Sequence, residues 1–234
     1  MSKESNVVNF YVMCNKLKTL VRRGWIDWSV HADRRESVAE HIYSTIMLAI
    51  AMKSEYKYDI DIMKVAYMLA IHELGECLIS DLTQFQISKE NKKIIEHMAV
   101  HDILSDLLDG EQIEEMYLEF DERKTKEAKF AHLCDKLECD LQAKLYGEDN
   151  LIDLTEQENN VSFFNEKVQS LFKEGCNWEE MWLSFGQRTY PYDKNFIAVS
   201  NYALNNKIKN NPHKLELEEK YKQLVEEYLA KENN

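Results

Sequence analysis

The sequence predicts an all-α protein, and three observations support this fold class. Apolar residues recur at helical spacing through most of the chain. Glycine and proline, which interrupt helices most often, number only 6 and 2 among 234 residues. No segment shows the alternation of apolar and polar residues that is typical of a half-buried strand. A chain of this length suits one domain, so we expect a single helical domain over residues 1–234.

Helical periodicity divides the first part of the chain into segments separated by polar loops at residues 22–36 and 80–83. In the first segment an apolar stripe is expected to be buried, formed by Val8, Tyr11, Val12, Leu17 and Leu20. The second segment begins at Ser37, where the Ser37-x-x-Glu40 spacing predicts a capping box. The expected helices span residues 7–21, 37–53, 59–76, 88–108, 111–120 and 125–146.

Residues 147–160, rich in polar residues, form the most linker-like stretch of the chain. Further helices are expected at residues 162–173, 177–187 and 193–209. Pro212 suits the first position of a final amphipathic helix that ends near Lys231. We therefore divide the domain into a core at about 7–146 and a helical C-terminal extension at about 161–232.

Composition excludes some classes of partner. The net charge of −13 argues against binding to duplex nucleic acid, which needs a basic surface. No apolar run reaches the about 20 residues that span a bilayer, and residues 1–5 show no signal-peptide core. The 5 cysteines contain no CxxC pair, which favours reduced thiols in the cytoplasm. A small anionic substrate is still compatible with this charge, since it needs only a local basic pocket.

Three segments place metal-ligand residue types inside helical patterns: residues 37–41, 72–76 and 132–135. They offer two imidazoles and two carboxylates, a donor set that divalent cations prefer. A cation with open positions polarises phosphoryl oxygens and lowers the pKa of water, which indicates hydrolysis of a phosphate ester.

Each segment also has a structural interpretation. His41 could be a packed core residue, and the pair His72-Glu73 could mark a helix leaving the core. Asp135 lies in a largely apolar helix, where Lys136 or an arginine could serve as its partner instead of a cation. Glu40 is assigned to the capping box and not to catalysis.

Glu76 follows His72 by four residues, a spacing that places the two on one helix face. A carboxylate one turn from a metal ligand is well placed to act as a base on water. An alternative site is the pair His97 and His101, since histidines at i and i+4 can share a metal, and His101-Asp102 is a literal His-Asp dipeptide. The flanking Lys92-Lys93 favours a polar helix face there instead.

The order His41, His72-Glu73, Asp135 resembles the signature of the HD-domain metal-dependent phosphohydrolases, and most closely that of the HD-domain 5′-deoxynucleotidases. The resemblance covers residues 22–146, about half of the chain. Its matching parts are Arg22-Arg-Gly-Trp25, Glu36-Ser-Val-Ala-Glu-His41, His72-Glu-Leu-Gly-Glu-Cys-Leu-Ile-Ser-Asp81 and Asp135-Lys-Leu-Glu138. The chain departs from the family pattern at Glu73, where aspartate is usual. Glutamate carries the same charge, with a reach longer by one methylene, and can still ligate a cation.

The resemblance implies an HD-domain helical bundle and a role for each matching residue. His41, His72, Glu73 and Asp135 would hold one divalent metal ion, with manganese, cobalt, magnesium, iron and zinc all open. Glu76 would act on water as a base or protonate the leaving oxygen, and Asp81 would orient a water or touch the sugar. The substrate-binding residues would be Arg22 or Arg23 on the phosphate and Trp25 against the nucleoside.

The structural alternatives are a solvated helix end for the two arginines and a core lid over the first helix for Trp25. The resemblance also implies release of phosphate from deoxyribonucleoside 5′-monophosphates by a homodimer. Two other functions stay open: another HD nucleotide hydrolase, such as a dNTP triphosphohydrolase, and a non-catalytic nucleotide-sensing module. Glu76 and Asp81 count against the sensing module, because such a module needs no proton shuttle.

Overall fold

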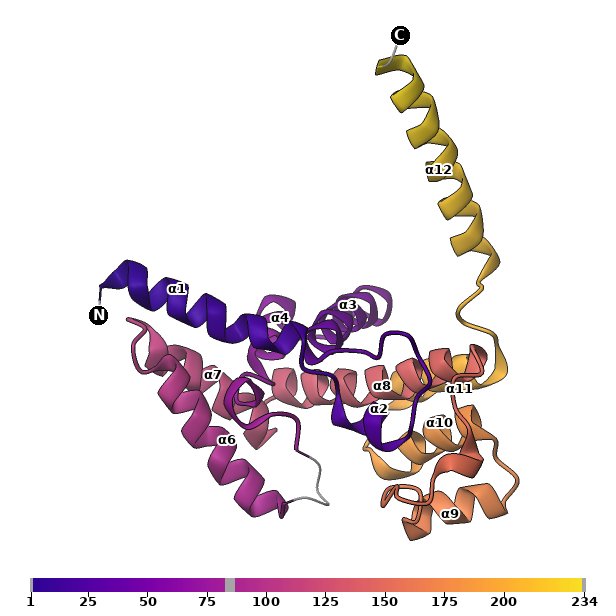
Figure 1. Cartoon of the computed structure of the whole chain (residues 1–234), viewed down its shortest axis with the longest axis horizontal. Coiled ribbons are helices and arrows are strands. Elements are labelled where there is room, and N and C mark those ends of the chain that lie inside the picture. The colour runs from indigo at the N-terminus through magenta and orange to yellow at the C-terminus, as the bar shows by residue number, and fades with distance from the viewer. Residues whose placement is uncertain (1, 83–86, 233–234) are drawn as a thin grey trace.

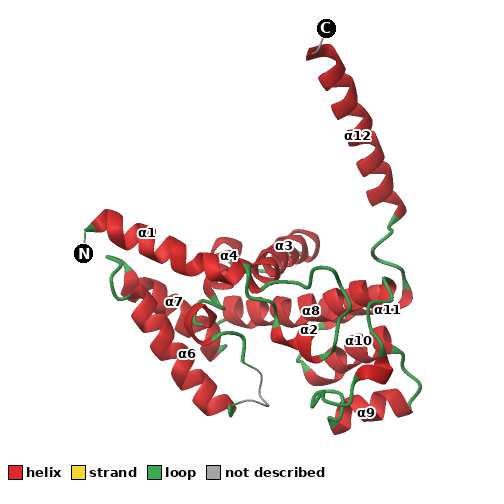
Figure 2. Ribbon diagram, in the orientation of Figure 1, coloured by secondary structure: helices red, strands yellow, loops and turns green. Residues whose placement is uncertain are grey.

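The all-α prediction is confirmed by the computed structural model, which describes residues 2–82 and 87–232. Figure 2 shows helices joined by loops throughout this part of the chain. Extended pairing there is limited to one isolated bridge between Val21 and Ser37. Thr83, at the end of an expected loop, lies outside the described residues. No described helix is both long and apolar enough to cross a membrane.

The helices fall into two groups along the chain. The motif-bearing part contains α1 (Lys3–Cys14), α2 (Arg23–Asp27), α3 (Val38–Tyr56), α4 (Ile62–Ile71), α5 (Glu76–Ile79), α6 (Lys89–Leu104), α7 (Gly110–Glu122) and α8 (Lys126–Glu148). The extension contains α9 (Glu166–Lys173), α10 (Trp178–Thr189), α11 (Lys194–Asn205) and α12 (Pro212–Glu232). Short 3-10 turns occur at Asn15–Lys18 and Leu154–Glu156.

The long helix α8 runs through the middle of the molecule, between the other core helices and the extension (Figure 1). It packs against α3, α4 and α7 on the core side and against α10 and α11 of the extension. Apolar positions along α8 are fully buried, among them Ala131, Cys134 and Leu137. Because α8 is covered on several sides, a polar residue in its middle, such as Asp135, lies inside the protein.

The start of α3 is fixed by the predicted capping box. The Ser37 side chain accepts a hydrogen bond from the Glu40 backbone, and the Glu40 carboxylate accepts one from the Ser37 backbone. The segment around Arg22 lies beside the start of this helix. Arg22 N–H donates to Glu36 O at 3.0 Å, and Val38 N–H donates to Leu20 O at 2.8 Å. These bonds hold Arg22 beside the first turn of α3, which carries His41.

The extension packs against the core through large side chains. Trp178 Nε1 donates to the Ala143 carbonyl of α8 at 2.9 Å, and Phe196 of α11 is fully buried in the cluster around α3, α4 and α8. Within the expected linker, the buried Gln157 donates to the Trp28 carbonyl at 3.0 Å. The final helix α12 projects away from the rest of the molecule and buries no residue (Figure 1). These contacts connect the extension to α8 and to the region of Trp28, and α12 lies beyond them.

The expected first helix is partly wrong. The α-helix ends at Cys14 and continues as a 3-10 turn, and Val8, Tyr11 and Val12 are exposed. Leu17 alone of the expected stripe is fully buried, in the cluster that includes Ile71, Cys77 and Val100. The first half of the stripe is an apolar helix face that no described residue buries, whereas Phe10 and Met13 of the same helix pack against that cluster.

The expected continuous helix over residues 59–76 is also wrong. It divides into α4, a series of tight turns at residues 72–75, and α5. His72 Nδ1 donates to the Leu69 carbonyl at 2.7 Å and so satisfies an acceptor in the last turn of α4. Gly75 then lies close to α6, where an added Cβ would come within 3.2 Å of the Glu96 carbonyl oxygen. His72 and Glu76 therefore do not share one helix face.

Candidate metal centre

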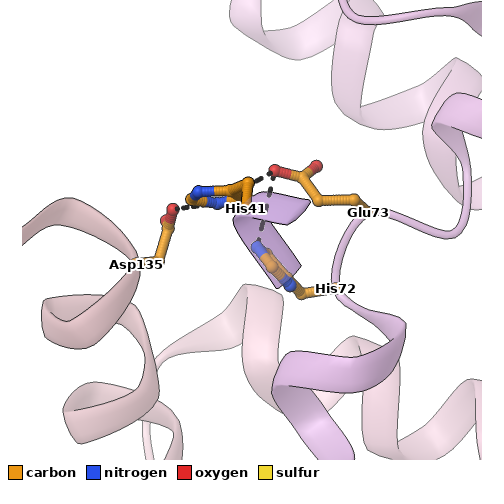
Figure 3. A group of neighbouring side chains, drawn as sticks. All are labelled: His41, His72, Glu73 and Asp135. Atoms are coloured by element: carbon orange, nitrogen blue, oxygen red, sulfur yellow. Dashed lines mark hydrogen bonds and ion pairs between the residues drawn. The ribbon is translucent and has the colours of Figure 1, made fainter. Parts of the chain in front are cut away.

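The structure brings together the four predicted metal ligands. His41 comes from α3, His72 and Glu73 from the turn after α4, and Asp135 from α8. One potential ligand atom from each residue lies within 4.8 Å of those from the other three. Figure 3 shows the four side chains pointing toward one another from these separate elements. Residues nearly a hundred positions apart in sequence thus form one donor cluster.

Distances within the cluster are those of groups around a shared centre. His41 Nε2 lies 3.2 Å from Asp135 Oδ1 and 3.9 Å from Glu73 Oε1. His72 Nε2 lies 3.4 Å from the same Glu73 oxygen. His41 is completely buried, and His72 and Asp135 are nearly so. Two nitrogens and two carboxylates in a mostly enclosed space are a donor set that suits divalent transition metals.

Both imidazoles are oriented by a second acceptor on the far side of the ring. His41 Nδ1 lies 2.6 Å from Glu138 Oε2, and His72 Nδ1 donates to the Leu69 carbonyl. In each ring this leaves Nε2 facing the cluster, as in histidines that bind metal. His72 Nε2 is buried and has no hydrogen-bond partner among the described residues. An orphaned, inward-facing nitrogen is the arrangement that a cation would satisfy, so the cluster fits a metal.

The cluster shifts the pKa values of its own members. Burial lowers the pKa of His72, which keeps this ring neutral. Burial and Arg22 oppose protonation of His41, but Asp135 and Glu138 raise the pKa of His41 to about 9. Burial opposes ionisation of Glu73, yet its interactions with His72, Arg22 and His41 lower the pKa of Glu73 to about 2. The carboxylates therefore stay ionised and attract a positive charge.

Lys136, one of the partners that the sequence allowed for Asp135, does pair with it. Besides His41, its Oδ2 lies 2.8 Å from Lys136 Nζ. After the opposing effect of burial, Lys136 and His41 hold the pKa of Asp135 well below its usual range. The lysine and the donor cluster occupy different oxygens, so the ion pair leaves Oδ1 directed at His41.

The two neighbouring arginines have different surroundings. Arg22 is largely buried, and its guanidinium donates to Glu73 Oε1 at 3.3 Å and to Cys139 Sγ at 3.1 Å. Arg23 instead directs its side chain to Asp27 at 2.7 Å. The backbone N–H of Arg23 donates to Asp81 Oδ2, also at 2.7 Å. Arg22 therefore contacts the donor cluster, while Arg23 connects Asp81 to the start of α2.

Glu76 is buried at the start of α5, with Oε1 3.8 Å from Lys92 Nζ of α6. Its other oxygen is buried without a hydrogen-bond partner in the described part of the chain. Burial, and then the charges of Glu73 and Asp81, raise the pKa of Glu76 well above its ordinary value. A buried carboxyl group of raised pKa close to ionised ligands can hold and deliver a proton.

Trp25 is deeply buried. Its ring is 2% exposed and packs edge-on against Tyr146 at 5.2 Å between centroids. Its Nε1 donates to Glu36 Oε2 at 2.8 Å, and Trp182 of α10 covers another side. This burial favours a structural role, although the neighbours belong to α8 and α10 and not to the first helix.

The alternative histidine pair lies on α6, away from the donor cluster. His97 Nε2 pairs with Asp121 at 2.9 Å, and His101 Nδ1 pairs with Glu114 at 3.0 Å. The His101 side chain is 66% exposed. Neither residue belongs to the clusters of three or more potential ligands found in the described residues. Each histidine thus has its own surface carboxylate, as the polar-face interpretation predicts.

Two contacts at the site were not predicted from the sequence. Glu138 matched the family pattern but received no role, although its spacing of three from Asp135 places both on one face of α8. Lys92 was assigned to a polar helix face, yet it reaches Glu76. The first contact could have been found from helical spacing, while the second depends on how α6 packs.

Known proteins are similar to this chain in sequence. Residues 14–180 match the HD domain family. The 5′-deoxynucleotidase HDDC2 of Dictyostelium discoideum is 36% identical over 150 residues, which cover 61% of this chain and 78% of that protein. The 5′-deoxynucleotidase hdd1 of Schizosaccharomyces pombe is 29% identical over 166 residues, covering 66% and 81%.

Solved structures share the fold. A protein from Pyrococcus horikoshii aligns with a TM-score of 0.59 and 21% identity, covering 84% of this chain and 97% of that one. A protein described as a predicted metal-dependent phosphohydrolase, from Magnetospirillum magnetotacticum, aligns with a TM-score of 0.57 and 21% identity, covering 87% and 92%. The family match spans more than half of the chain and includes all four residues of the donor cluster. The chain therefore belongs to the HD domain family.

Proposed function

We propose that this protein is a metal-dependent phosphomonoesterase that releases phosphate from deoxyribonucleoside 5′-monophosphates. The observation that carries the proposal is the cluster of His41, His72, Glu73 and Asp135, with the Arg22 guanidinium hydrogen-bonded to one of its members. A cation site and a guanidinium side by side suit a phosphate group. Similarity to two proteins named 5′-deoxynucleotidases supports the choice of substrate.

The four clustered residues would hold one divalent ion, and manganese, cobalt, magnesium, iron and zinc are all compatible with the donor set. When bound, such an ion supplies Lewis-acid polarisation of a phosphoryl oxygen and a lowered pKa for water. Glu138 and the Leu69 carbonyl would keep the two imidazoles in the ligating orientation.

The other residues of the site would handle the substrate and the proton. Arg22 would turn part of its guanidinium from Glu73 toward the phosphate, where a planar fork of donors binds two oxygens. Glu76 would take a proton from the attacking water or deliver one to the leaving sugar oxygen. Asp81, held by the Arg23 backbone, would orient a water or the sugar. Trp25 would support the segment around Glu36 by its hydrogen bond to that residue. Contact of the substrate with Trp25 or with the Arg23 side chain is a prediction.

Two alternatives differ in what the site releases. A dNTP triphosphohydrolase would use the same donor cluster but release triphosphate. A non-catalytic nucleotide sensor would bind without turnover. The buried carboxyl group of Glu76 counts against a sensor, because burying an ionisable group without full hydrogen bonding is costly and binding alone does not require it.

A substrate and metal panel tests the proposal. Phosphate, pyrophosphate and triphosphate release should be measured from ribo- and deoxyribonucleoside mono- and triphosphates with each of Mg²⁺, Mn²⁺, Co²⁺ and Zn²⁺, and metal content should be determined on the same preparation. We expect phosphate release from deoxyribonucleoside monophosphates. Triphosphate release would select the first alternative, and bound metal with nucleotide binding but no turnover would select the second.

We further propose a cytoplasmic homodimer. Exposed apolar side chains on α12, such as Leu217, Tyr221 and Leu224, support an interface with a second copy. All 5 cysteines are unpaired, which supports a reducing compartment. Light scattering measures the assembly, and a monomer at micromolar concentration would exclude the dimer.

A further inference from the structure

Helix α6 packs directly on the turn that carries two residues of the site. Gly75 lies between Glu73 and Glu76, and an added Cβ there would meet the backbone of Glu96, at 3.2 Å from its carbonyl oxygen. Glycine therefore permits a close approach of α6 to this turn. The approach brings side chains from the turn of α6 before Glu96 within reach of Glu76.

Lys92 uses this approach. Its Nζ lies 3.3 Å from Glu96 Oε1 on the same helix and 3.8 Å from Glu76 Oε1 across the gap. The lysine side chain is 25% exposed and the Glu76 side chain 2%. The other oxygen of Glu76 has no hydrogen-bond partner among the described residues. Within this part of the chain, Lys92 is therefore the side chain that the structure pairs with the Glu76 carboxyl group.

The next residue provides an internal comparison. Lys93 pairs with a different carboxylate, with Nζ 2.7 Å from Asp121 of α7 and a side chain 53% exposed. The two consecutive lysines thus have different partners. Lys92 reaches a buried carboxyl group of the site, and Lys93 makes an ion pair near the surface. A surface pair of this kind contributes little, so Lys93 serves as a matched control.

Negative charge accumulates around Lys92. After the opposing effect of burial, the carboxylates of Glu96, Glu73, Glu76 and Asp81 raise its pKa, so the ammonium keeps its charge. The charged ammonium is thus held between two carboxyl groups, Glu96 on its own helix and Glu76 at the site.

We propose that Lys92 is a positioning residue for the hydrolytic reaction: its ammonium fixes the Glu76 carboxyl group in the orientation needed for proton transfer. This inference rests on the proposed role of Glu76. It assigns α6, which contributes no residue to the donor cluster, a part in the reaction. Lys92 acts through Glu76 and not through the metal or the phosphate.

The test compares four variants of the full chain, Lys92→Met, Lys92→Arg, Lys93→Met and Glu76→Gln, using the deoxyribonucleoside monophosphate that turns over fastest in the panel above. Lys92→Met should lower kcat by about tenfold or more with KM nearly unchanged. Metal content and the thermal unfolding midpoint should stay at the level of the unmodified protein. Lys92→Arg, which keeps the charge, should restore most of kcat, and Lys93→Met should resemble the unmodified protein.

The double variant Glu76→Gln/Lys92→Met decides how Lys92 acts. If Lys92 acts through Glu76, its removal should cost little more once Glu76 has been replaced. A full additional loss, an effect on KM alone, or a Lys92→Met protein as active as Lys93→Met would each overturn the proposal. Full activity in Glu76→Gln would instead reject the proton role of Glu76 itself, which separates failure of the proposed function from failure of this inference.

Discussion

His41 and His72 are buried where α3, α4 and α8 meet, whereas His97 and His101 lie on α6 beside surface carboxylates. The literal His-Asp dipeptide is His101-Asp102 on the surface, while the buried cluster contains His72-Glu73. The presence of a literal His-Asp dipeptide is thus a poorer guide to the metal centre than burial of the side chains and the meeting of several helices.

Orientation also separates the two pairs. His41 and His72 each have Nδ1 engaged by an acceptor outside the cluster, so that both Nε2 atoms face a common centre. His97 and His101 use different nitrogens on different carboxylates, Nε2 on Asp121 and Nδ1 on Glu114. A metal centre requires rings held in a common direction, and surface ion pairs impose no such constraint.

The sharpest test of this comparison removes one residue from each region. His72→Ala and Asp135→Ala should each reduce bound metal to background and abolish phosphate release, because each removes one of four donors. His101→Ala should keep both properties. Metal analysis by inductively coupled plasma spectrometry and a phosphate-release assay on the same preparations measure this. Loss of metal in His101→Ala, with retention in His72→Ala, would move the site to α6.

A second test separates proton transfer from metal binding. Glu76→Ala should retain metal and bind nucleotide, because Glu76 lies outside the four-residue cluster. Its turnover should fall by about 10²–10⁴, the usual contribution of a positioned acid or base. Calorimetry for nucleotide affinity and steady-state kinetics are the measurements. Loss of metal would make Glu76 a ligand, and unchanged turnover would remove the main argument against a nucleotide sensor.

A third test compares the acceptors that orient the histidines. Glu138→Ala removes the carboxylate beside His41 Nδ1 and should weaken metal affinity by about 10–100-fold. Asp121→Ala removes the carboxylate beside His97 in the same way and should leave metal affinity unchanged. Competition titration with a metal-sensitive dye reports both affinities. Equal effects would mean that the acceptor of His41 has no special role at the centre.

Helical periodicity was sufficient to predict the all-α fold. The chemistry of the candidate donors left structural roles open, and the resemblance to the HD-domain phosphohydrolases implied the set of four that the structure brings together. His41 and Asp135 could be found because each interrupts a buried apolar pattern with a side chain that needs a partner. The capping box at Ser37 could be found because its interactions are local in sequence.

Features that depend on contacts distant in sequence could not be predicted. The end of α4 at Ile71 lies next to the turn where α6 packs against Gly75, a contact between separate helices. Trp25 is buried because α10, over a hundred residues later, covers it. The exposed stripe on α1 shows the same limit, since periodicity identifies an apolar face but not its neighbour.

The smallest expected effect concerns Glu73. The buried cluster has glutamate after its histidine, His72, whereas the dipeptide on α6 has aspartate after His101. Glu73→Asp shortens the side chain by one methylene and keeps its charge, so metal should remain bound. Activity should stay within about tenfold, a barrier change of roughly 1.4 kcal/mol, with the preferred metal open to change because the carboxylate reaches less far. Glu73→Gln should lose far more, because it removes a negative donor that also holds Arg22. Turnover with each of the panel metals measures both variants. Full activity in Glu73→Gln would show that this carboxylate lies outside the ligand set and that the centre is built from three residues.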